Sequence, residues 1–216
     1  MFDEIKEKAI EEIQTKSFGV TKQFLEIHEI VHEDNKPKIS RIDTEKSDGT
    51  LIVYFSVVGE KFYFVIYLDS KPCISVRWVE IQPYHSISFR ATSEILTVID
   101  LANLTTLMST SRWNKGDKKK IGSSFHKFSF LEFEPDPGAD EFEDKMNKML
   151  DFLERDIEGV KRLVEKANGY IQVISVFHNG NTMLGGHHLN KDIIKRLAFF
   201  NIAVDFDEYA EGNMFT

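Results

Sequence analysis

The fold of this chain is decided by residues 51–89, which read LIVYFSVVGEKFYFVIYLDSKPCISVRWVEIQPYHSISF. Along Leu51–Val58, both faces of the expected strand carry apolar side chains, which predicts a central strand that is covered on both sides. Turn residues at Gly59-Glu60, Asp69–Pro72 and Gln82–Tyr84 then separate three further strands. Because short turns join antiparallel neighbours, we predict a four-stranded antiparallel meander. Its strands are expected over residues 51–58, 62–68, 73–80 and 86–91.

Length and composition are those of an ordinary globular protein, with 216 residues of which 42% are hydrophobic and 29% charged. Cys73 is the single cysteine, which excludes an intramolecular disulfide and a metal–thiolate cluster. The N-terminal segment is charged throughout, unlike a signal peptide, and no stretch approaches the roughly 20 apolar residues that span a bilayer. We therefore expect a cytoplasmic protein with no membrane partner.

The formal net charge is −8. Nucleic-acid binding needs Lys and Arg to neutralise phosphates, so this balance argues against nucleic acid as a general partner. An acidic chain is favoured in its encounter with a basic partner, although solubility alone also accounts for such a charge.

Two helices are expected before the meander, because apolar residues recur at helical spacing on either side of Ser17–Gly19. Their apolar faces predict a two-layer packing on the meander. We therefore predict an α+β protein, with N-terminal helices packed on the antiparallel β-meander in residues 1–82 and an α/β sandwich domain in residues 83–216. The apolar residues of the two helices are Phe2, Ile5, Ala9 and Ile13, followed by Val20, Phe24, Ile27 and Val31.

Helix and strand signals alternate in the second half of the chain. Thr97, with Asp100 three residues later, predicts a capped helix that runs to about Met108. The two prolines of Pro135–Gly138 exclude regular structure there, and Asn190 is expected to cap a short helix. Strands are expected over residues 125–133, 170–177 and 202–206, and helices over residues 140–153 and 157–167.

Several motifs of the second half match those of a known family in order and spacing. A strand and a helix precede Thr110–Asp117 (TSRWNKGD), and the chain continues to Leu189-Asn190, Arg196-Leu197 and Val204–Tyr209 (VDFDEY). With these motifs, residues 86–209 resemble the bacterial and phage domain-of-unknown-function family four-two-seven-nine. The resemblance implies an α/β sandwich domain and a bacterial source, and it implies no chemistry. It does not extend to the N-terminal part.

The most prominent motif, HEIVH, has histidines at His28 and His32. On a helix, two histidines four residues apart share a face and bind zinc, while the intervening Glu29 acts as a general base. The apolar stripe through Ile27 and Val31 predicts a helix here, so a zinc-dependent hydrolase is one interpretation. The same stripe turns Glu29 toward solvent, and no well-placed third ligand follows. We therefore favour two surface or boundary histidines.

A second histidine group, His187-His188, follows Gly185-Gly186 and has His178 as a possible further ligand for a metal or phosphate. The glycine pair lacks the spaced glycines and the lysine of a nucleotide-binding fingerprint. Adjacent histidines in a glycine-containing loop are more often solvated, which is the interpretation that we favour. We accordingly expect no cofactor.

A basic loop, Lys115 with Lys118–Lys120, lies beside Arg112 and Trp113. Lysines next to an aromatic ring are able to hold a nucleic-acid backbone and stack a base, but the overall acidity favours a solvated loop. Arg and Trp are over-represented in binding hot spots, so Arg112 and Trp113 are candidate protein-binding residues.

Seven acids occur within residues 132–144, and two prolines among them exclude an EF-hand loop. Two interpretations stay open: a solvated loop whose acids favour the start of the next helix, or a docking surface for a basic protein. The candidate docking acids are Glu132, Glu134, Asp136, Asp140 and Glu141.

We expect a non-enzymatic protein-binding module, because the chain is acidic and carries no convincing catalytic set. Its concrete form is an immunity-type inhibitor that covers the active site of a basic toxin, such as a nuclease, with an acidic surface. Two alternatives stay open: the zinc-dependent hydrolase of residues 28–32, and a regulatory protein that contacts nucleic acid through residues 115–120.

Overall fold

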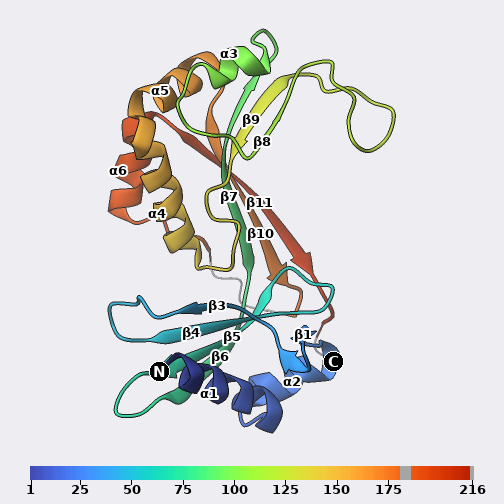
Figure 1. Ribbon diagram of the computed structural model, residues 1–216, viewed down its shortest axis with the longest axis vertical. Coiled ribbons are helices and arrows are strands. Elements are labelled where there is room, and N and C mark those ends of the chain that lie inside the picture. Colours follow the sequence, from blue (N-terminus) through green and yellow to red (C-terminus); the bar gives the residue numbers. More distant parts are fainter. Residues whose placement is uncertain (181–185, 215–216) are drawn as a thin grey trace.

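The computed structural model describes residues 1–180 and 186–214, which form two units with separate β-sheets (Figure 1). Both units combine helices with antiparallel strands, so the predicted α+β class is confirmed. The chain passes from the first sheet to the second at Pro83. Within the described ranges, no helix has both the length and the apolar character that crossing a bilayer requires.

The first unit contains two helices, a small hairpin and a four-stranded antiparallel sheet. Its elements are α1 (Phe2–Thr15), α2 (Gly19–Ile27), β1 (His32–Glu33), β2 (Lys36–Pro37), β3 (Ile39–Asp43), β4 (Leu51–Ser56), β5 (Tyr63–Asp69) and β6 (Ser75–Gln82). The strands of the main sheet follow the order β3-β4-β5-β6, and each is antiparallel to its neighbour.

Both faces of this sheet are covered, and β4 is therefore buried along almost its whole length. On one face, Val53 shares a buried cluster with Ile5 of α1 and Phe24 of α2. On the other face, Tyr54 packs in a cluster with Ala139 of the second unit. The prediction of a central strand that is covered on both sides is confirmed.

The fourth strand that we predicted for the meander belongs to the other sheet. β6 ends at Gln82, and the next strand, β7 (Tyr84–Ser93), begins after Pro83 alone and joins the second sheet. A single residue is too short to turn a strand back onto its neighbour, and proline has no N–H for the hydrogen bond of a tight turn. The chain therefore continues from one sheet into the next, and the meander has three of the four predicted strands.

The second unit is a five-stranded sheet with helices on one face. Its elements are β7, α3 (Val98–Ala102), β8 (Ser111–Trp113), β9 (Ser129–Phe133), α4 (Phe142–Leu153), the 3-10 helix η1 (Glu154–Asp156), α5 (Ile157–Lys166), β10 (Tyr170–His178), α6 (Lys191–Phe200) and β11 (Ala203–Glu211). The strand order is β11-β10-β7-β9-β8. All neighbours are antiparallel except β10 and β11, which are parallel and connected through α6.

Helices α4, α5 and α6 lie on the same side of the second sheet, so this unit has the two layers expected of an α/β domain (Figure 1). Ile87 and Phe89 of β7 belong to the buried cluster that these helices share. Strand side chains alternate, so Ser88 and Arg90 point to the opposite face. No helix of the described ranges covers that face in Figure 1.

The helix predicted to start at Thr97 exists but is short. Thr97 and Asp100 form the predicted capping box, in which each side chain accepts a hydrogen bond from the backbone of the other. The helix ends at Ala102, six residues before the predicted end. Beyond the helix, the hydroxyl of Thr105 donates a hydrogen bond to Oδ2 of Asp156, the N-cap of α5, at 2.8 Å.

Candidate functional site

The HEIVH motif is not helical, so the helix predicted for this zinc motif is wrong. α2 ends at Ile27, and the backbone of His28 is extended, with φ −133° and ψ 157°. Ile30 forms a β-bridge with Val57, which takes the chain out of the helix and into the sheet. His32 lies on the exposed strand β1 and donates a hydrogen bond from Nδ1 to the carbonyl oxygen of Ile30, at 2.8 Å. The two histidines share no helix face, which removes the geometric basis of the hydrolase interpretation.

His28 instead contacts a histidine of the second unit. Its Nε2 atom lies 3.0 Å from Nε2 of His178, the last residue of β10. The ring of Phe62 packs edge-on against both imidazoles, with centroid distances of 5.4 and 5.0 Å. Burial lowers the pKa of His28 and of His178, and the neighbouring His28 lowers the pKa of His178 further. Within the described ranges, neither histidine belongs to a group of three potential metal ligands.

The metal or phosphate site considered for the second histidine group does not assemble, and of the two histidines that we expected to be solvated, the side chain of His187 is buried. His178 contacts His28, whereas His187 contacts the hydroxyl of Ser175, with Nε2 and Oγ 3.1 Å apart. His188 is exposed. The preceding Gly185 lies outside the described residues.

Ser175, His187 and Glu208 have the residue types of a catalytic triad but not its arrangement. In a triad, the base contacts serine through one ring nitrogen and the acid through the other. Here, Nε2 of His187 faces both the Ser175 hydroxyl, at 3.1 Å, and a carboxylate oxygen of Glu208, at 3.4 Å. Ser175 is fully buried, so its hydroxyl is not open to a substrate. This group was not predicted, because its members are far apart in the sequence.

A fourth member of this group is His85, whose Nδ1 atom lies 2.9 Å from Oγ of Ser175. Burial, and then the charges of His187 and Lys145, lower the pKa of His85 to about 3. The imidazole is therefore neutral at physiological pH. Together these contacts satisfy a buried hydroxyl, which is a structural role.

Two of the predicted docking acids lie on the uncovered face of the second sheet and have partners within it. Glu132 of β9 accepts a hydrogen bond from the guanidinium of Arg90 at 2.8 Å. Glu134 accepts one from the hydroxyl of Ser86 at 2.6 Å. Glu132 is thus neutralised by an arginine on the neighbouring strand.

The other three predicted docking acids lie in ion pairs, and two of these acids bind residues of the first unit. Asp136 binds the ammonium group of Lys148 at 2.8 Å. The side chain of Asp140 has no exposed surface and binds Lys148 at 2.6 Å and Arg41 of β3 at 3.1 Å. Glu141 binds Lys46 of the first unit at 2.6 Å. Asp140 and Glu141 therefore connect the two units, whereas Asp136 is paired within the second unit. None of the three contributes to the free acidic surface expected from the sequence.

The charges at this boundary are close to balanced. Although burial opposes it, hydrogen bonds to Asp144 and Glu141 raise the pKa of Lys46, which stays protonated. Asp43, Asp140 and Asp144 are the one group of three potential metal ligands found in the described ranges, with oxygens within 4.8 Å of one another. Cationic side chains already contact all three, as Lys46 lies 3.7 Å from Asp43 and 2.5 Å from Asp144. We therefore interpret the group as an ion-pair network.

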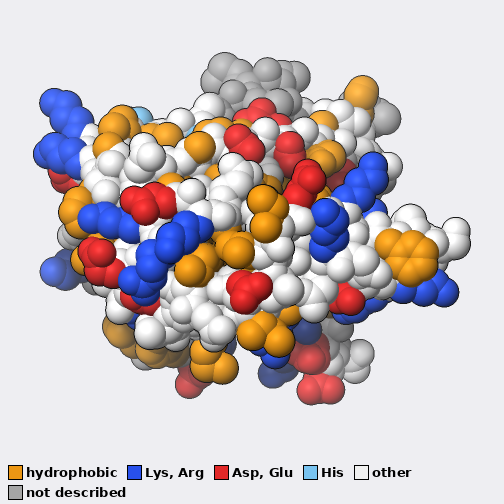
Figure 2. Space-filling model, turned by 90° about the horizontal axis from the view of Figure 1, so that it is seen from above, with side chains coloured by type: hydrophobic (Ala, Val, Ile, Leu, Met, Phe, Trp, Pro, Cys, Tyr) orange, Lys and Arg blue, Asp and Glu red, His pale blue; other side chains and the backbone are white. Residues whose placement is uncertain are grey.

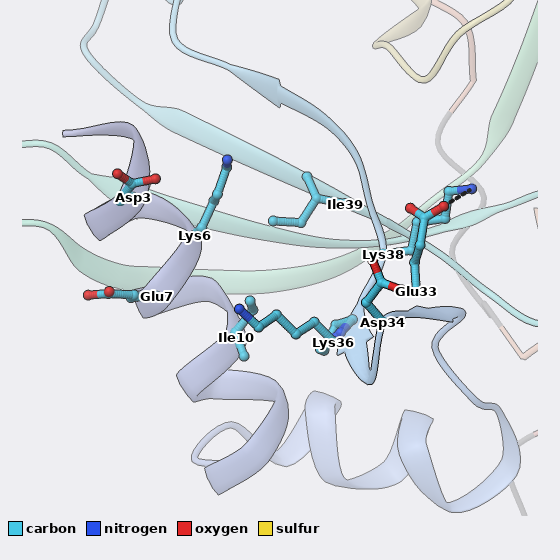
Figure 3. A pocket seen from close by; sticks show the side chains of 10 residues that line it. Asp3, Lys6, Glu7, Ile10, Glu33, Asp34, Lys36, Lys38 and Ile39 are labelled. Atoms are coloured by element: carbon cyan, nitrogen blue, oxygen red, sulfur yellow. Dashed lines mark ion pairs between the residues drawn. The ribbon is translucent and has the colours of Figure 1, made fainter.

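A groove of about 640 Å³ separates α1 from the β1–β2 hairpin (Figure 3). Acids and lysines line it in nearly equal number, and one pair, Lys38 and Glu33, is 4.0 Å apart. The mixture of charges gives the groove no preference for a ligand of either sign. Its charged residues are Asp3, Lys6, Glu7, Glu33, Asp34, Lys36 and Lys38.

The candidate hot-spot residues Arg112 and Trp113 have different environments. Arg112 is exposed on β8. Trp113 is partly buried, with its ring stacked between Phe130 at 3.9 Å and His126 at 4.4 Å. Its indole N–H is buried and meets no acceptor in the part of the chain that the structure describes.

β11 is an exposed strand of the second unit. It forms one end of the sheet, and only Val204 and Glu211 among its nine residues are partly buried. Phe206 and Tyr209 are 41% and 51% exposed. Within the described ranges, its acids form no ion pair with Lys or Arg, although Glu208 contacts His187. The four acids are Asp205, Asp207, Glu208 and Glu211.

We predicted a final strand over residues 202–206, which β11 confirms and extends. Its role as an exposed, acidic edge was missed. The alternation within VDFDEY is visible in the sequence, but whether a strand lies at the edge or centre of a sheet depends on strand order.

One family model matches the chain. The model, described as Domain of unknown function (DUF4279), covers residues 82–211 and includes every strand of the second sheet. No curated protein and no solved structure matches the chain. The resemblance inferred from the Thr110–Asp117 and Val204–Tyr209 motifs is confirmed. The chain therefore belongs to the DUF4279 family.

Proposed function

We propose that this protein is a non-enzymatic protein-binding module whose partner is a basic protein that docks on β11. The proposal depends on one observation: β11 is a nine-residue exposed edge strand that carries four acids and neither Lys nor Arg. A partner strand with basic side chains would complement it in both hydrogen bonding and charge.

The backbone of β11 supports this mode of binding. β11 pairs with β10 in continuous register from Ala203↔Tyr170 to Glu211↔His178. It occupies the end of the sheet, so its other edge has no neighbouring strand in the described ranges. An edge strand presents a row of unpaired N–H and C=O groups, which bind an additional strand through main-chain hydrogen bonds.

Charge selects which strand is able to add. A second copy of β11 would bring like charges together, which is unfavourable for self-association. A basic strand would instead gain opposite charges across the new pair, and long-range attraction would accelerate its encounter. The acids of β11 therefore discriminate between partners while the backbone supplies the contact.

Two aromatic side chains supply apolar anchors. Phe206 and Tyr209 are odd-spaced along the strand, so they lie on opposite faces. The ring of Phe206 is stacked on the imidazole of His187, with centroids 5.1 Å apart, and is thereby held in place. Exposed aromatic rings that are already ordered lose little entropy when a partner covers them.

The specific partner class that we propose is a basic toxin, such as a nuclease, which this protein would inhibit as an immunity-type protein of the bacterial cytoplasm. Inhibition would follow from covering the active site after a charge-steered encounter. The acids that we expected to dock this partner, including Asp140 and Glu141, already neutralise lysines and an arginine of the protein. β11 therefore replaces them as the docking surface.

The test compares two charge reversals of equal size. Asp205→Lys/Asp207→Lys changes β11, whereas Glu4→Lys/Glu7→Lys changes exposed positions of α1. With a partner first captured from lysate and then purified, calorimetry should show about 100-fold weaker binding for the β11 variant. The α1 variant should bind like the unmodified protein. Equal losses in both variants would contradict docking on β11.

Hydrogen exchange tests the strand-addition mode independently. Amide protons at the open edge of β11 should exchange quickly in the free protein and slowly in the complex. Protection that appears on another element, with β11 unchanged, would show that the partner binds elsewhere.

A further inference from the structure

The net charge of −8 is distributed very unevenly along the chain. We use the term basic finger for residues 112–128, which comprise the last two residues of β8 and the connection from β8 to β9. This segment has a net charge of +5, so the rest of the chain carries −13. The negative net charge of the whole chain therefore does not describe this segment, which is strongly basic. Its charged residues are Arg112, Lys115, Asp117, Lys118, Lys119, Lys120 and Lys127.

The basic finger is an ordered hairpin that projects from the body of the molecule (Figure 1). Backbone hydrogen bonds join its two arms, from Gly116 N to His126 O at 2.8 Å and from Lys119 N to Ser124 O at 2.9 Å. Gly122 at its tip has φ +82°, which glycine adopts without strain. Seen from above, Lys and Arg side chains lie beside hydrophobic ones on the projection at the right (Figure 2).

The cations of the basic finger are not neutralised within the protein. In the described ranges, none of its Lys or Arg side chains forms an ion pair. Lys115 donates from Nζ only to the backbone carbonyl of Glu94, at 2.9 Å. In the body, by contrast, Lys46 and Lys148 each bind carboxylates within 2.8 Å. The finger therefore offers its charge to an external anion.

Exposed aromatic rings accompany this charge. Phe125 and Phe128, on the returning arm, are 59% and 38% exposed. At the base of the finger, His126 is stacked on Trp113 with centroids 4.4 Å apart. Cations that bind phosphates, next to rings that stack on bases, are the combination by which proteins hold single strands. We propose that the basic finger binds single-stranded nucleic acid.

Two other anionic partners fit the finger less well. A membrane surface would require an apolar tip, but Ile121 is the one apolar residue of the segment Lys119–Ser124. A duplex would satisfy the lysines and leave the rings of Phe125 and Phe128 unused, because its bases are already stacked. Unpaired bases are the partner that uses both sets of side chains.

The test measures fluorescence anisotropy of labelled, mixed-sequence oligonucleotides of about 20 nucleotides, as single-stranded DNA, single-stranded RNA and duplex DNA. Affinity for the single strands should fall with salt, with a log–log slope of about −3 if four phosphates are neutralised. Lys118→Glu/Lys119→Glu/Lys120→Glu should weaken binding at least about tenfold. Phe125→Ser/Phe128→Ser should also weaken it about tenfold while leaving the salt slope unchanged.

A matched control changes the net charge equally at exposed lysines elsewhere, as Lys22→Glu/Lys61→Glu/Lys166→Glu. This variant should bind within about twofold of the unmodified protein, because the neutralised phosphates lie at the finger. Equal losses in the finger and control variants would overturn the proposal, as would tighter binding to the duplex. Binding to phosphatidylserine vesicles but not to oligonucleotides would overturn it in favour of a membrane partner.

This inference goes beyond the proposed protein-binding function and fails separately from it. The variant Asp205→Lys/Asp207→Lys, which should lose the protein partner, should still bind the oligonucleotide. The finger triple variant, conversely, should still bind the protein partner. Circular dichroism and melting temperature check that each variant is folded, which is expected because all the substituted side chains are on the surface.

Discussion

The Nε2 atoms of His28 and His178 lie 3.0 Å apart, although the residues are 150 positions apart in the sequence. One imidazole must donate and the other accept for this contact to be a hydrogen bond, so the two share one Nε2 proton. The pair connects the end of α2 to the end of β10 and therefore joins the two units. Protonation of both imidazoles would break this hydrogen bond, so we expect the junction between the units to be sensitive to acid.

We expect the folded state to lose stability below about pH 6.5, where histidine titrates in an unfolded chain. The pKa values of His28, His85, His178 and His187 are all lowered by burial. At a pH between the folded and the unfolded pKa values, the unfolded state binds more protons than the folded state. The free energy of unfolding is therefore highest above this range and decreases as the pH is lowered through it. Urea unfolding at a series of pH values measures the loss.

Two variants separate the histidine pair from other sources of pH dependence. In His28→Gln/His178→Gln, the amides are able to hydrogen-bond without titrating, so the fall in stability should become shallower. His32→Ala changes an exposed histidine and should leave the pH dependence as it was. A double variant with an unchanged pH profile would mean that this pair does not titrate with unfolding.

We predict that Asp140→Asn lowers the free energy of unfolding by about 2 kcal/mol. Breaking a fully buried ion pair costs about 3–5 kcal/mol. The loss should be smaller here, because Arg41 and Lys148 are partly exposed and able to rehydrate. Chemical denaturation measures the change. Glu11→Gln, which removes an exposed pair with Lys8, should leave stability unchanged within error. If Asp140→Asn leaves the free energy of unfolding unchanged, the units are held together mainly by apolar contacts.

Tyr54→Phe should be neutral or stabilise the protein by up to about 1 kcal/mol, because a buried hydroxyl without a hydrogen bond is costly. In the described ranges, the hydroxyl of Tyr54 is buried without a partner. Tyr67→Phe is the matched variant on the neighbouring strand β5, where the hydroxyl accepts a hydrogen bond from Gln82 at 2.7 Å. It should destabilise by about 1 kcal/mol. Melting curves that rank the two variants in the reverse order would contradict this prediction.

Gly212→Ala should destabilise the protein by about 1–3 kcal/mol, because alanine is strained at positive φ and overpacks its surroundings. Gly212 has φ +88°, and a Cβ atom there would lie 2.8 Å from the ring of Phe62. Gly19→Ala, where no atom lies within 4 Å of the added Cβ, is the control and should not destabilise. If both variants melt alike, the segment after β11 does not pack on the first unit in solution.

Local signals in the sequence determined the elements of this protein. The spacing of Ile5, Ala9 and Ile13 specifies the buried face of α1, and Thr97 with Asp100 specifies a capping box. The apolar character of both faces of β4 specifies a covered central strand. These features follow from residues that lie within one or two turns of each other, so the sequence alone is sufficient.

Tertiary structure decided what the elements do. The stripe through Ile27 continues in the sequence beyond the end of α2, but a bridge between Ile30 and Val57 makes the next segment extended. From the sequence, the acids near Asp140 predict an exposed acidic surface. In the structure Asp140 forms an internal ion pair instead, because Arg41 of the first unit contacts it. The acids of β11 stay exposed because strand order places β11 at the edge of the sheet. The lysines of the basic finger stay exposed because this hairpin projects from the body of the molecule. Each outcome depends on contacts between distant residues, which periodicity and spacing do not encode.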